Sequence, residues 1–421
     1  PESLVGRLSG VRYTVGDEGD VDISHVGVAG TPRLLVRRML ELGCENAPGP
    51  AILMTSATSM LEPSPSYHVH EGPHYVLRRP NAGEGWSRSR YEFLPIKHPQ
   101  DSRKTLFFSG SRLSQREQIL QNMVDQLLVD GELSLVESAI AQNDPEHGVR
   151  RKAAFVVNSY EQCRLVYEHI RSHHPAWRSR VRVLVRGGVL GDAGVTTEHA
   201  ITASEVERLG HDDDWDLFIF PMSAIGRGVN IVFGRGPRAG SAMIGSVFFL
   251  TRPHPKTDSL SFLQGIVARE SEAFDRARFA SMPQALRAMR QGRAELSFKV
   301  RQLLRMQQSA RSLGPYAEEF VADQMIMILQ TIGRAMRGDC PAFIYFVDAA
   351  WAPLSAIDQS DTPRTSMLLM MREILRKCLE HEQPAIRACY ENLYRTFFTP
   401  LSQVQGVREE GVDADAPSAP L

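Results

Sequence analysis

Residues 153–160 read Ala-Ala-Phe-Val-Val-Asn-Ser-Tyr, a short apolar run followed by polar residues. A short apolar run that leads into a helical pattern is typical of a buried strand in a parallel sheet. We therefore predict a strand over 153–158 and a helix from Tyr160 to about Ser172. Ser159 stands where a helix-capping hydroxyl is favoured.

Other apolar runs follow the same rhythm. Strands are predicted at 51–55, 181–185, 216–220, 246–250 and 342–347. Helical patterns lie among them, and Ser114 is the expected cap of one that runs to about Val129. Apolar strands separated by helices predict an α/β fold, with a mostly parallel sheet flanked by helices. The helical stretches at about 114–142 and 258–330 are expected to be insertions into this fold.

The composition is that of an ordinary globular protein. The 421 residues are 43% hydrophobic and 23% charged, and no run of 18 uncharged apolar residues predicts a membrane span. The five cysteines show no metal-binding or disulfide-rich spacing, which is typical of reduced thiols in the cytoplasm. We therefore expect a cytoplasmic protein with no membrane partner.

A net charge of −1 conceals one strongly basic segment. Between Arg276 and Arg311 nine basic residues accompany one acid, which gives +8 and leaves −9 for the rest of the chain. Within it, Arg301 and Arg305 lie one helical turn apart, beside an apolar stripe that is formed by Leu296, Val300, Leu303 and Leu304. The segment is either a surface that binds a polyanion or a solvated helix face. On the first reading, Arg301 and Arg305 contact the phosphates of a single strand.

Four short motifs follow or precede predicted strands in a fixed order. They are Thr55-Ser-Ala-Thr58, Val156-Val-Asn-Ser-Tyr160, Met222-Ser-Ala-Ile-Gly-Arg-Gly-Val-Asn230 and Gln330-Thr-Ile-Gly-Arg-Ala-Met-Arg337.

The last motif has a physical logic of its own. On a helix, Gln330, Arg334 and Arg337 project from one face, and Gly333 removes a side chain beside them. Two guanidinium groups at one edge suit a triphosphate whose γ-phosphoryl gathers charge in the transition state. An arginine in this role is worth roughly 10³–10⁵ in rate, or about 4–7 kcal/mol.

In these motifs the chain resembles the C-terminal half of a superfamily 2 helicase, over roughly residues 50–350. The segments correspond to helicase motifs III, IV, V and VI, and the Asn-Ser-Tyr of motif IV is similar to the DinG/XPD branch. The resemblance implies a second RecA-like motor domain at 51–360. Residues 1–50 would then link from a missing first motor domain, C-terminal helices would occupy 361–403, and 404–421 would be a disordered tail.

The resemblance also implies roles for single residues. Where the family usually has Asp, this chain has Asn230, which keeps a hydrogen bond to a ribose hydroxyl without the charge. The implied assignments are Arg334, Arg337 and Gln330 for catalysis; Gly333, Gly228 and Asn230 for nucleotide binding; Ser159, Tyr160, Ser223 and Arg227 for nucleic-acid binding; and Ser56, Ala57 and Thr58 for coupling.

Two motifs of an ATPase are missing from the sequence. It contains no GxxxxGK[ST] and no Asp-Glu box, which hold the phosphates and Mg²⁺. Because the chain begins with Pro1, we expect it to be a fragment whose first RecA-like domain, in cis or in trans, binds most of the ATP and Mg²⁺. The expected activity is that of an ATP-dependent helicase or translocase on single-stranded nucleic acid, with DNA as the expected strand. The alternative is a non-catalytic nucleic-acid-binding or scaffold module with a helicase-like fold.

Three other patterns were weighed as sites. His68, His70 and His74 could bind zinc, but no further ligand completes the set, and an exposed loop explains them better. Asp212-Asp-Asp214 fits a solvated turn, and Gly187–Gly191 lacks the GxGxxG of a dinucleotide site. We therefore predict no metal site.

Overall fold

The structure is a computed structural model that describes part of the chain. The described residues are 7–15, 21–29, 39, 42–43, 49–53, 58, 60–69, 75–76, 85–129, 134–142, 150–186, 198–224, 230–253, 261–306, 314 and 316–409. The chain forms two compact units. Unit 1 comprises residues 1–76 and 255–323, and unit 2 comprises residues 77–254 and 324–421.

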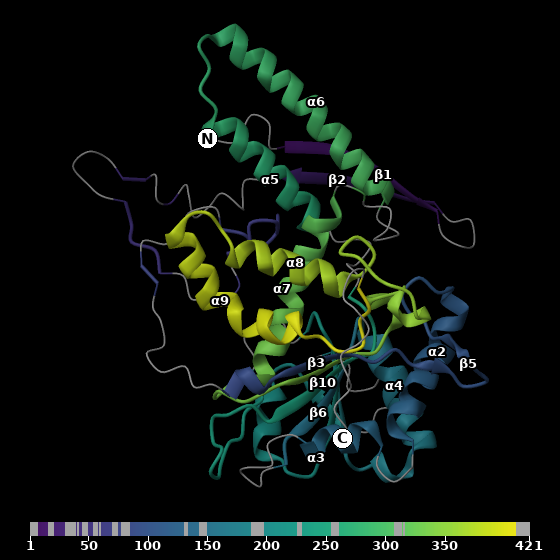
Figure 1. The fold of residues 1–421 in the computed structure, drawn as a ribbon. Coiled ribbons are helices and arrows are strands. Elements are labelled where there is room, and N and C mark those ends of the chain that lie inside the picture. The colour runs from purple at the N-terminus through teal and green to yellow at the C-terminus, as the bar shows by residue number, and fades with distance from the viewer. Residues whose placement is uncertain are drawn as a thin grey trace. The chain divides into compact units, whose positions relative to one another are not determined.

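Unit 2 is built on a seven-stranded sheet in which every neighbouring pair is parallel (Figure 1). The strand order is β3-β11-β10-β6-β9-β7-β8. This arrangement confirms the predicted α/β fold with a parallel sheet and is consistent with a RecA-like domain. The strands are β3 (Arg90–Phe93), β6 (Lys152–Val157), β7 (Val181–Val185), β8 (Ala200–Thr202), β9 (Leu217–Pro221), β10 (Ile244–Phe249) and β11 (Phe343–Phe346), and a separate hairpin is formed by β4 (Lys97–His98) and β5 (Asp101–Thr105).

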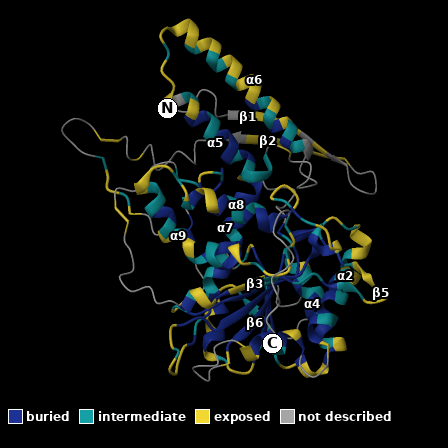
Figure 2. Cartoon of the chain, viewed as in Figure 1, coloured by how far each residue is buried: buried dark blue, intermediate teal, exposed yellow. Residues whose placement is uncertain are grey.

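The central strand β6 is buried on both of its faces. Ala153, Phe155 and Val157 belong to one hydrophobic cluster, while Ala154 and Val156 point to the opposite face and are equally buried. Successive side chains of a strand point to opposite faces of the sheet. Because all of those in β6 are buried, both faces must be covered. Figure 2 shows the sheet as the most buried part of unit 2.

Helices cover the sheet. In unit 2 they are α2 (Leu113–Leu128), α3 (Leu135–Gln142), α4 (Tyr160–His173), the later turns of α7 (Ala317–Ala335), α8 (Met367–Leu379) and α9 (Pro384–Ser402). As predicted, the Ser159 hydroxyl caps α4 by accepting a hydrogen bond from the Gln162 N–H. The predicted cap at Ser114 is wrong: α2 begins at Leu113, and Arg112 precedes it without a side-chain cap.

Unit 1 contains a hairpin and helices. Its described elements are β1 (Arg7–Val15), β2 (Val21–Ala29), α5 (Ser261–Arg276), α6 (Met282–Met306) and the first turns of α7. The helical stretch predicted at 258–330 is therefore three helices, and Pro283 lies in the first turn of α6, where a missing N–H costs nothing.

The strand predicted at 51–55 is wrong for its described residues. Residues 51–53 form no strand, and Leu53 is 82% exposed. A five-residue apolar run does not by itself show what will cover it.

The C-terminal boundary also moves. Residues 404–409, predicted as the start of a disordered tail, are ordered: the Gln405 N–H donates to the Tyr91 carbonyl, and Arg372 pairs with Glu409. The predicted disordered tail is therefore wrong for residues 404–409, and residues 410–421 lie outside the described part. Within the described ranges, no helix is both long and apolar enough to cross a membrane.

Candidate functional site

Arg334 lies in the last turn of α7 and is half-buried. Its Nε and Nη1 atoms are fully buried and have no hydrogen-bond partner among the residues that the structure describes. Burial, together with the nearby charge of Arg337, lowers the pKa of Arg334 to about 10. A buried guanidinium without an anion is costly, so this position is unfavourable for the fold by itself.

A second arginine holds this end of α7 in place. The Arg151 side chain is 1% exposed and donates to four backbone carbonyls. The acceptors are Ala335 at the end of α7 (2.6 Å), Pro341 (2.5 Å), Ala242 (2.9 Å) and Ile244 (2.7 Å). Arg151 precedes β6, while Ile244 begins β10 and Pro341 precedes β11. The end of α7 is therefore fixed at the amino edge of the sheet.

Arg337 lies outside the helix, contrary to the prediction that one helix face carries the whole motif. The helix ends at Ala335, and a turn follows in which Gly338 and Asp339 have positive φ values of 69° and 61°. A side chain on Gly338 would also lie 2.6 Å from the Ser241 Cβ atom. The turn leaves Arg337 exposed, yet near enough to Arg334 for its charge to lower the pKa of Arg334.

The other two residues of the motif are placed differently. Gln330 is half-buried on α7, one turn before Arg334. At Gly333 an added Cβ would lie 3.5 Å from the Phe397 ring of α9, an ordinary contact. The space beside Gly333 is thus occupied by an aromatic ring of the same unit.

The residues predicted to contact nucleic acid lie at the opposite edge. Ser159 and Tyr160 directly follow the carboxyl end of β6, and Ser223 follows that of β9 and is exposed. The Met222 N–H donates to the Val157 carbonyl, which joins the two strand ends. Ser159 is used for capping, and Tyr160 lies under the Arg186 guanidinium at 5.3 Å. Its burial raises the pKa of the Tyr160 hydroxyl.

Asn230 belongs to the amino edge. The carbonyl of the next residue, Ile231, accepts from the Met243 N–H, and the Ala242 N–H donates to the Arg337 carbonyl. Backbone bonds through Ile231, Met243 and Ala242 therefore place Asn230 at the same edge of the sheet as Arg337. Ser159, Tyr160 and Ser223 lie at the other edge, about 20 Å away along six-residue strands.

Several predicted site residues fall outside the described part. Ser56 and Ala57 do, and so do Arg227 and Gly228. Thr58 is described, belongs to unit 1 and is 5% exposed. The roles predicted for these residues remain predictions.

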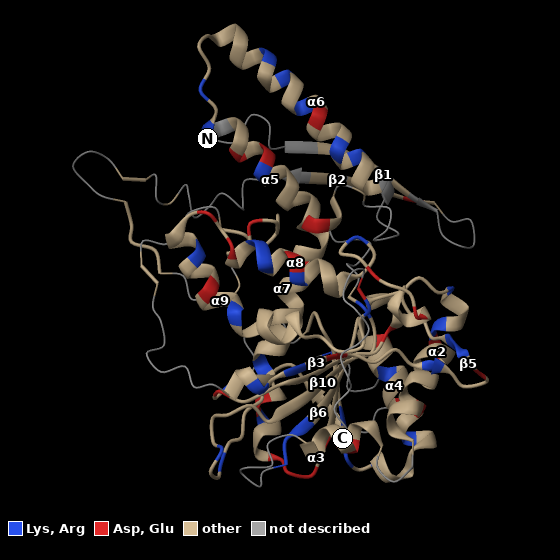
Figure 3. Cartoon of the chain, viewed as in Figure 1, with Lys and Arg blue, Asp and Glu red and all other residues tan. Residues whose placement is uncertain are grey.

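The basic helix α6 is as exposed as its sequence suggests. Leu296, Val300 and Leu303 are buried, which confirms the predicted apolar stripe, while Leu304 is half-buried. Exposed arginines mark its other faces (Figure 3), namely Arg287, Arg290, Arg293 and Arg301. The Nε of Arg301 donates to the Ser297 carbonyl of its own helix. The side chain of Arg305 lies outside the described part.

One buried acid at the carboxyl edge was missed by the sequence analysis. Asp348 follows β11, is fully buried and accepts four backbone N–H bonds, from Phe108, Ser109, Arg252 and Ala350. The Asn158 amide donates to the Arg252 carbonyl at 2.8 Å. Asp348 therefore organises the loops after β10 and β11 around Asn158, a role that only the fold reveals.

A hollow lies at the amino edge beside β3. Its volume is about 430 Å³, and its lining includes Arg88, Arg90, Pro341 and Gln403. No residue of the predicted site lines it. Of the patterns weighed as alternatives, Asp212 and Asp213 pair with Arg182 and Arg235, as in a solvated turn.

Comparison with known proteins adds no assignment, because no family model matches this chain and a search of curated proteins finds no similar sequence.

Proposed function

We propose that this chain is the second motor domain of an ATP-dependent helicase or translocase that moves on single-stranded nucleic acid, most simply DNA. The resemblance in motif order supports this reading, and so does the parallel sheet of unit 2. In this role the chain supplies arginines to a nucleotide whose phosphates and Mg²⁺ are bound mainly by a first RecA-like domain.

The observation that carries the proposal is the state of Arg334. Its buried Nε and Nη1 atoms donate to nothing in the described part of the chain, and its pKa is lowered to about 10. Separate oxygens of a polyphosphate would accept from these N–H groups and neutralise the charge, which is the chemistry that a nucleotide would bring. Arg337, exposed beside it, would extend the same contact, and Asn230 at this edge could bond a ribose hydroxyl.

The division of the site between two edges also supports a motor. Nucleotide contacts would lie at the amino edge, with Arg334, Arg337 and Asn230. Nucleic-acid contacts would lie at the carboxyl edge, where Ser159 and Ser223 follow the ends of the adjacent strands β6 and β9. Small hydroxyl side chains and backbone N–H groups bind phosphates without reading base sequence.

Helix α6 supports the nucleic-acid part of the proposal. Its exposed arginines would contact phosphates, and Phe298, which is 65% exposed, lies one turn before Arg301. Aromatic rings among cations form the sequence-tolerant surface that single strands prefer, because every base can stack.

Charge reversal on α6 is expected to weaken strand binding. The double variant Arg290→Glu, Arg301→Glu removes two phosphate contacts, so the plot of log affinity against log salt should flatten by about 1.4. Fluorescence anisotropy with a labelled oligothymidine, from 50 to 300 mM salt, measures this slope. The control is Arg395→Glu, an exposed arginine on α9. A slope that stays the same in the double variant, or falls equally in the control, would contradict the role of α6.

The function itself is tested with the protein that includes the upstream reading frame. We expect that frame to encode a GxxxxGK[ST] loop and an Asp-Glu box. The protein should hydrolyse ATP, and single-stranded DNA should stimulate the turnover. Strand binding without turnover would instead identify the alternative, a non-catalytic binding module.

A further inference from the structure

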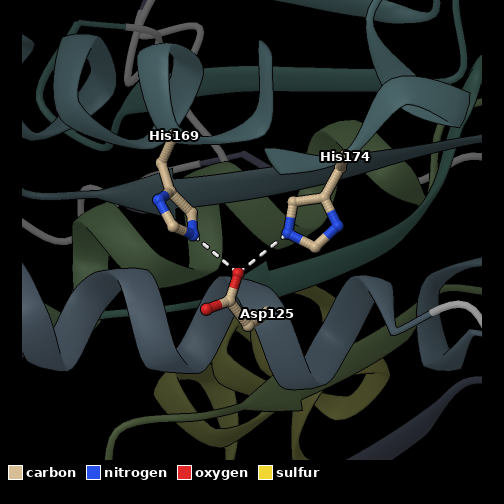
Figure 4. A group of neighbouring side chains, drawn as sticks. All are labelled: Asp125, His169 and His174. Carbon is tan, nitrogen blue, oxygen red and sulfur yellow. Dashed lines mark hydrogen bonds and ion pairs between the residues drawn. The ribbon is translucent and has the colours of Figure 1, made fainter. Parts of the chain in front are cut away.

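Three side chains of unit 2 bring their donor atoms together at the end of α4 (Figure 4). Asp125 comes from α2, His169 from the last turns of α4, and His174 directly follows that helix. The Asp125 Oδ1 atom lies 2.6 Å from His169 Nε2 and 2.9 Å from His174 Nε2. All three donor atoms lie within 4.8 Å of one another.

The two imidazoles are held rigidly. Their side chains are only 7% and 10% exposed. The His174 N–H donates to the Ile170 carbonyl at 2.9 Å, and a short 3-10 helix with the buried Trp177 follows. Helices α2 and α4 pack through buried residues such as Val124 and Val166. Donors on packed helices keep their geometry without a ligand, which favours binding.

The convergence of both Nε2 atoms on one oxygen suits a cation. If both Nε2 atoms carry protons, each can donate a hydrogen bond to Asp125. If both are deprotonated, one metal ion can bind the two nitrogen lone pairs and the carboxylate at once. Zinc with ligands at roughly 2.0–2.1 Å would hold them about 3.3 Å apart, so the side chains need only small shifts.

We propose that Asp125, His169 and His174 bind one zinc-type divalent transition-metal ion, which fastens α2 to the end of α4. Two imidazoles and one carboxylate form a three-ligand set that leaves a position for water. Asp125 is 42% exposed, so this position and the entry path face solvent. Magnesium, which prefers oxygen ligands and waters, does not fit the set.

His173 allows the proposed site to be distinguished from an ordinary surface pair of histidines. It lies four residues after His169, the spacing of an ordinary surface metal-binding pair on a helix. In the structure, however, the two rings are stacked with centroids 4.4 Å apart, and His173 Nδ1 lies 3.2 Å from the His169 carbonyl. The proposed ion therefore requires His174 and not His173, whereas an adventitious surface pair would require His173.

The test uses the whole chain, stripped of metal with a chelator and titrated with Zn²⁺ or Co²⁺. We expect one ion per chain, visible Co²⁺ absorption bands of a low-coordinate site, and a thermal midpoint that rises with metal concentration. Mg²⁺ should not shift the midpoint. These readouts do not involve ATP or nucleic acid, so the result stands apart from the proposed motor function.

Variants decide between the two ligand sets. His174→Gln and Asp125→Asn should each weaken binding by about 100-fold or more, since loss of even an outer-shell partner costs roughly 10–100-fold. His173→Gln should bind as the parent does. Asp125 is partly exposed, so its variant keeps the test open if His174→Gln fails to fold. Absence of binding by the parent, or an equal loss in His173→Gln, would overturn the proposal.

Discussion

Under the proposed motor function, Arg334→Ala is expected to slow strand-stimulated ATP hydrolysis by roughly 10³–10⁵-fold when this chain is joined to the proposed first motor domain. The side chain is half-buried, its Nε and Nη1 atoms lack partners among the described residues, and it stands beside Arg337. It would stabilise charge that gathers on the γ-phosphoryl only in the transition state. The turnover number should therefore fall much more than the KM for ATP rises.

The control for Arg334 is Arg395→Ala on α9, which should stay within twofold of the parent. Arg334→Lys should restore little, because an ammonium group cannot place donors at the positions of the guanidinium nitrogens. Single-strand affinity should hardly change, since Arg334 lies at the edge opposite Ser159 and Ser223. If the turnover of Arg334→Ala stays within tenfold of the parent, the proposed catalytic role of Arg334 is contradicted.

Arg334 should also oppose folding. At neutral pH it is charged, although burial and Arg337 lower its pKa to about 10. Between pH 10 and the higher pKa of an arginine in the unfolded chain, the unfolded chain binds more protons, so stability rises with pH there. Below pH 10 the whole cost is present. Arg334→Met should therefore raise the free energy of unfolding by about 1 kcal/mol while abolishing turnover. If Arg334 only stabilised the fold, the same substitution would lower the free energy of unfolding.

Arg151→Met is expected to destabilise unit 2 by about 3–5 kcal/mol. The substitution keeps an apolar stem but withdraws donors from four carbonyls, which belong to Ala242, Ile244, Ala335 and Pro341. Buried acceptors that lose their donors cannot regain water, so most of the desolvation penalty remains. The amino edge of the sheet and the end of α7 should loosen first.

Urea unfolding followed by tryptophan fluorescence measures the loss of stability of unit 2. All four tryptophans, at positions 86, 177, 215 and 351, belong to unit 2. The matched control is the preceding residue: Arg150 is 47% exposed and bridges Glu137 and Asp216. Arg150→Met should cost no more than about 1 kcal/mol. Equal losses in the two variants would show that the four carbonyls do not depend on Arg151.

The sheet could be predicted from the sequence because its strands are nearly continuous apolar runs. Strands β6, β7, β9, β10 and β11 begin and end within two residues of the predicted bounds. The run at 51–53 has the same composition but is exposed, since composition does not say which surface will cover a strand. The sequence predicts a helix through Arg337, but the helix ends at Ala335. The positive φ values of Gly338 and Asp339 in the turn that follows have no reliable sequence signal.

The candidate site was predictable only in part. The Gln330–Arg337 motif marked the right end of α7, but nothing distinguishes Arg151 from Arg150 in the sequence Arg-Arg-Lys before a strand. Its acceptors lie 91 to 190 residues away. His169 and His174 are five residues apart, which is not a helical ligand spacing, and Asp125 comes from another helix. Such sites depend on tertiary packing and not on local pattern.

Strand β6 starts beside the carbonyl-bound Arg151 and finishes at the residue before Asn158, in the middle of seven paired strands. An extended strand that is hydrogen-bonded on both sides can neither stretch nor slip by a fraction of a residue. A tilt imposed at its beginning would therefore move its end as well. In the proposed motor, the sheet would in this way transmit a movement from the Arg334 edge to the Ser159 edge.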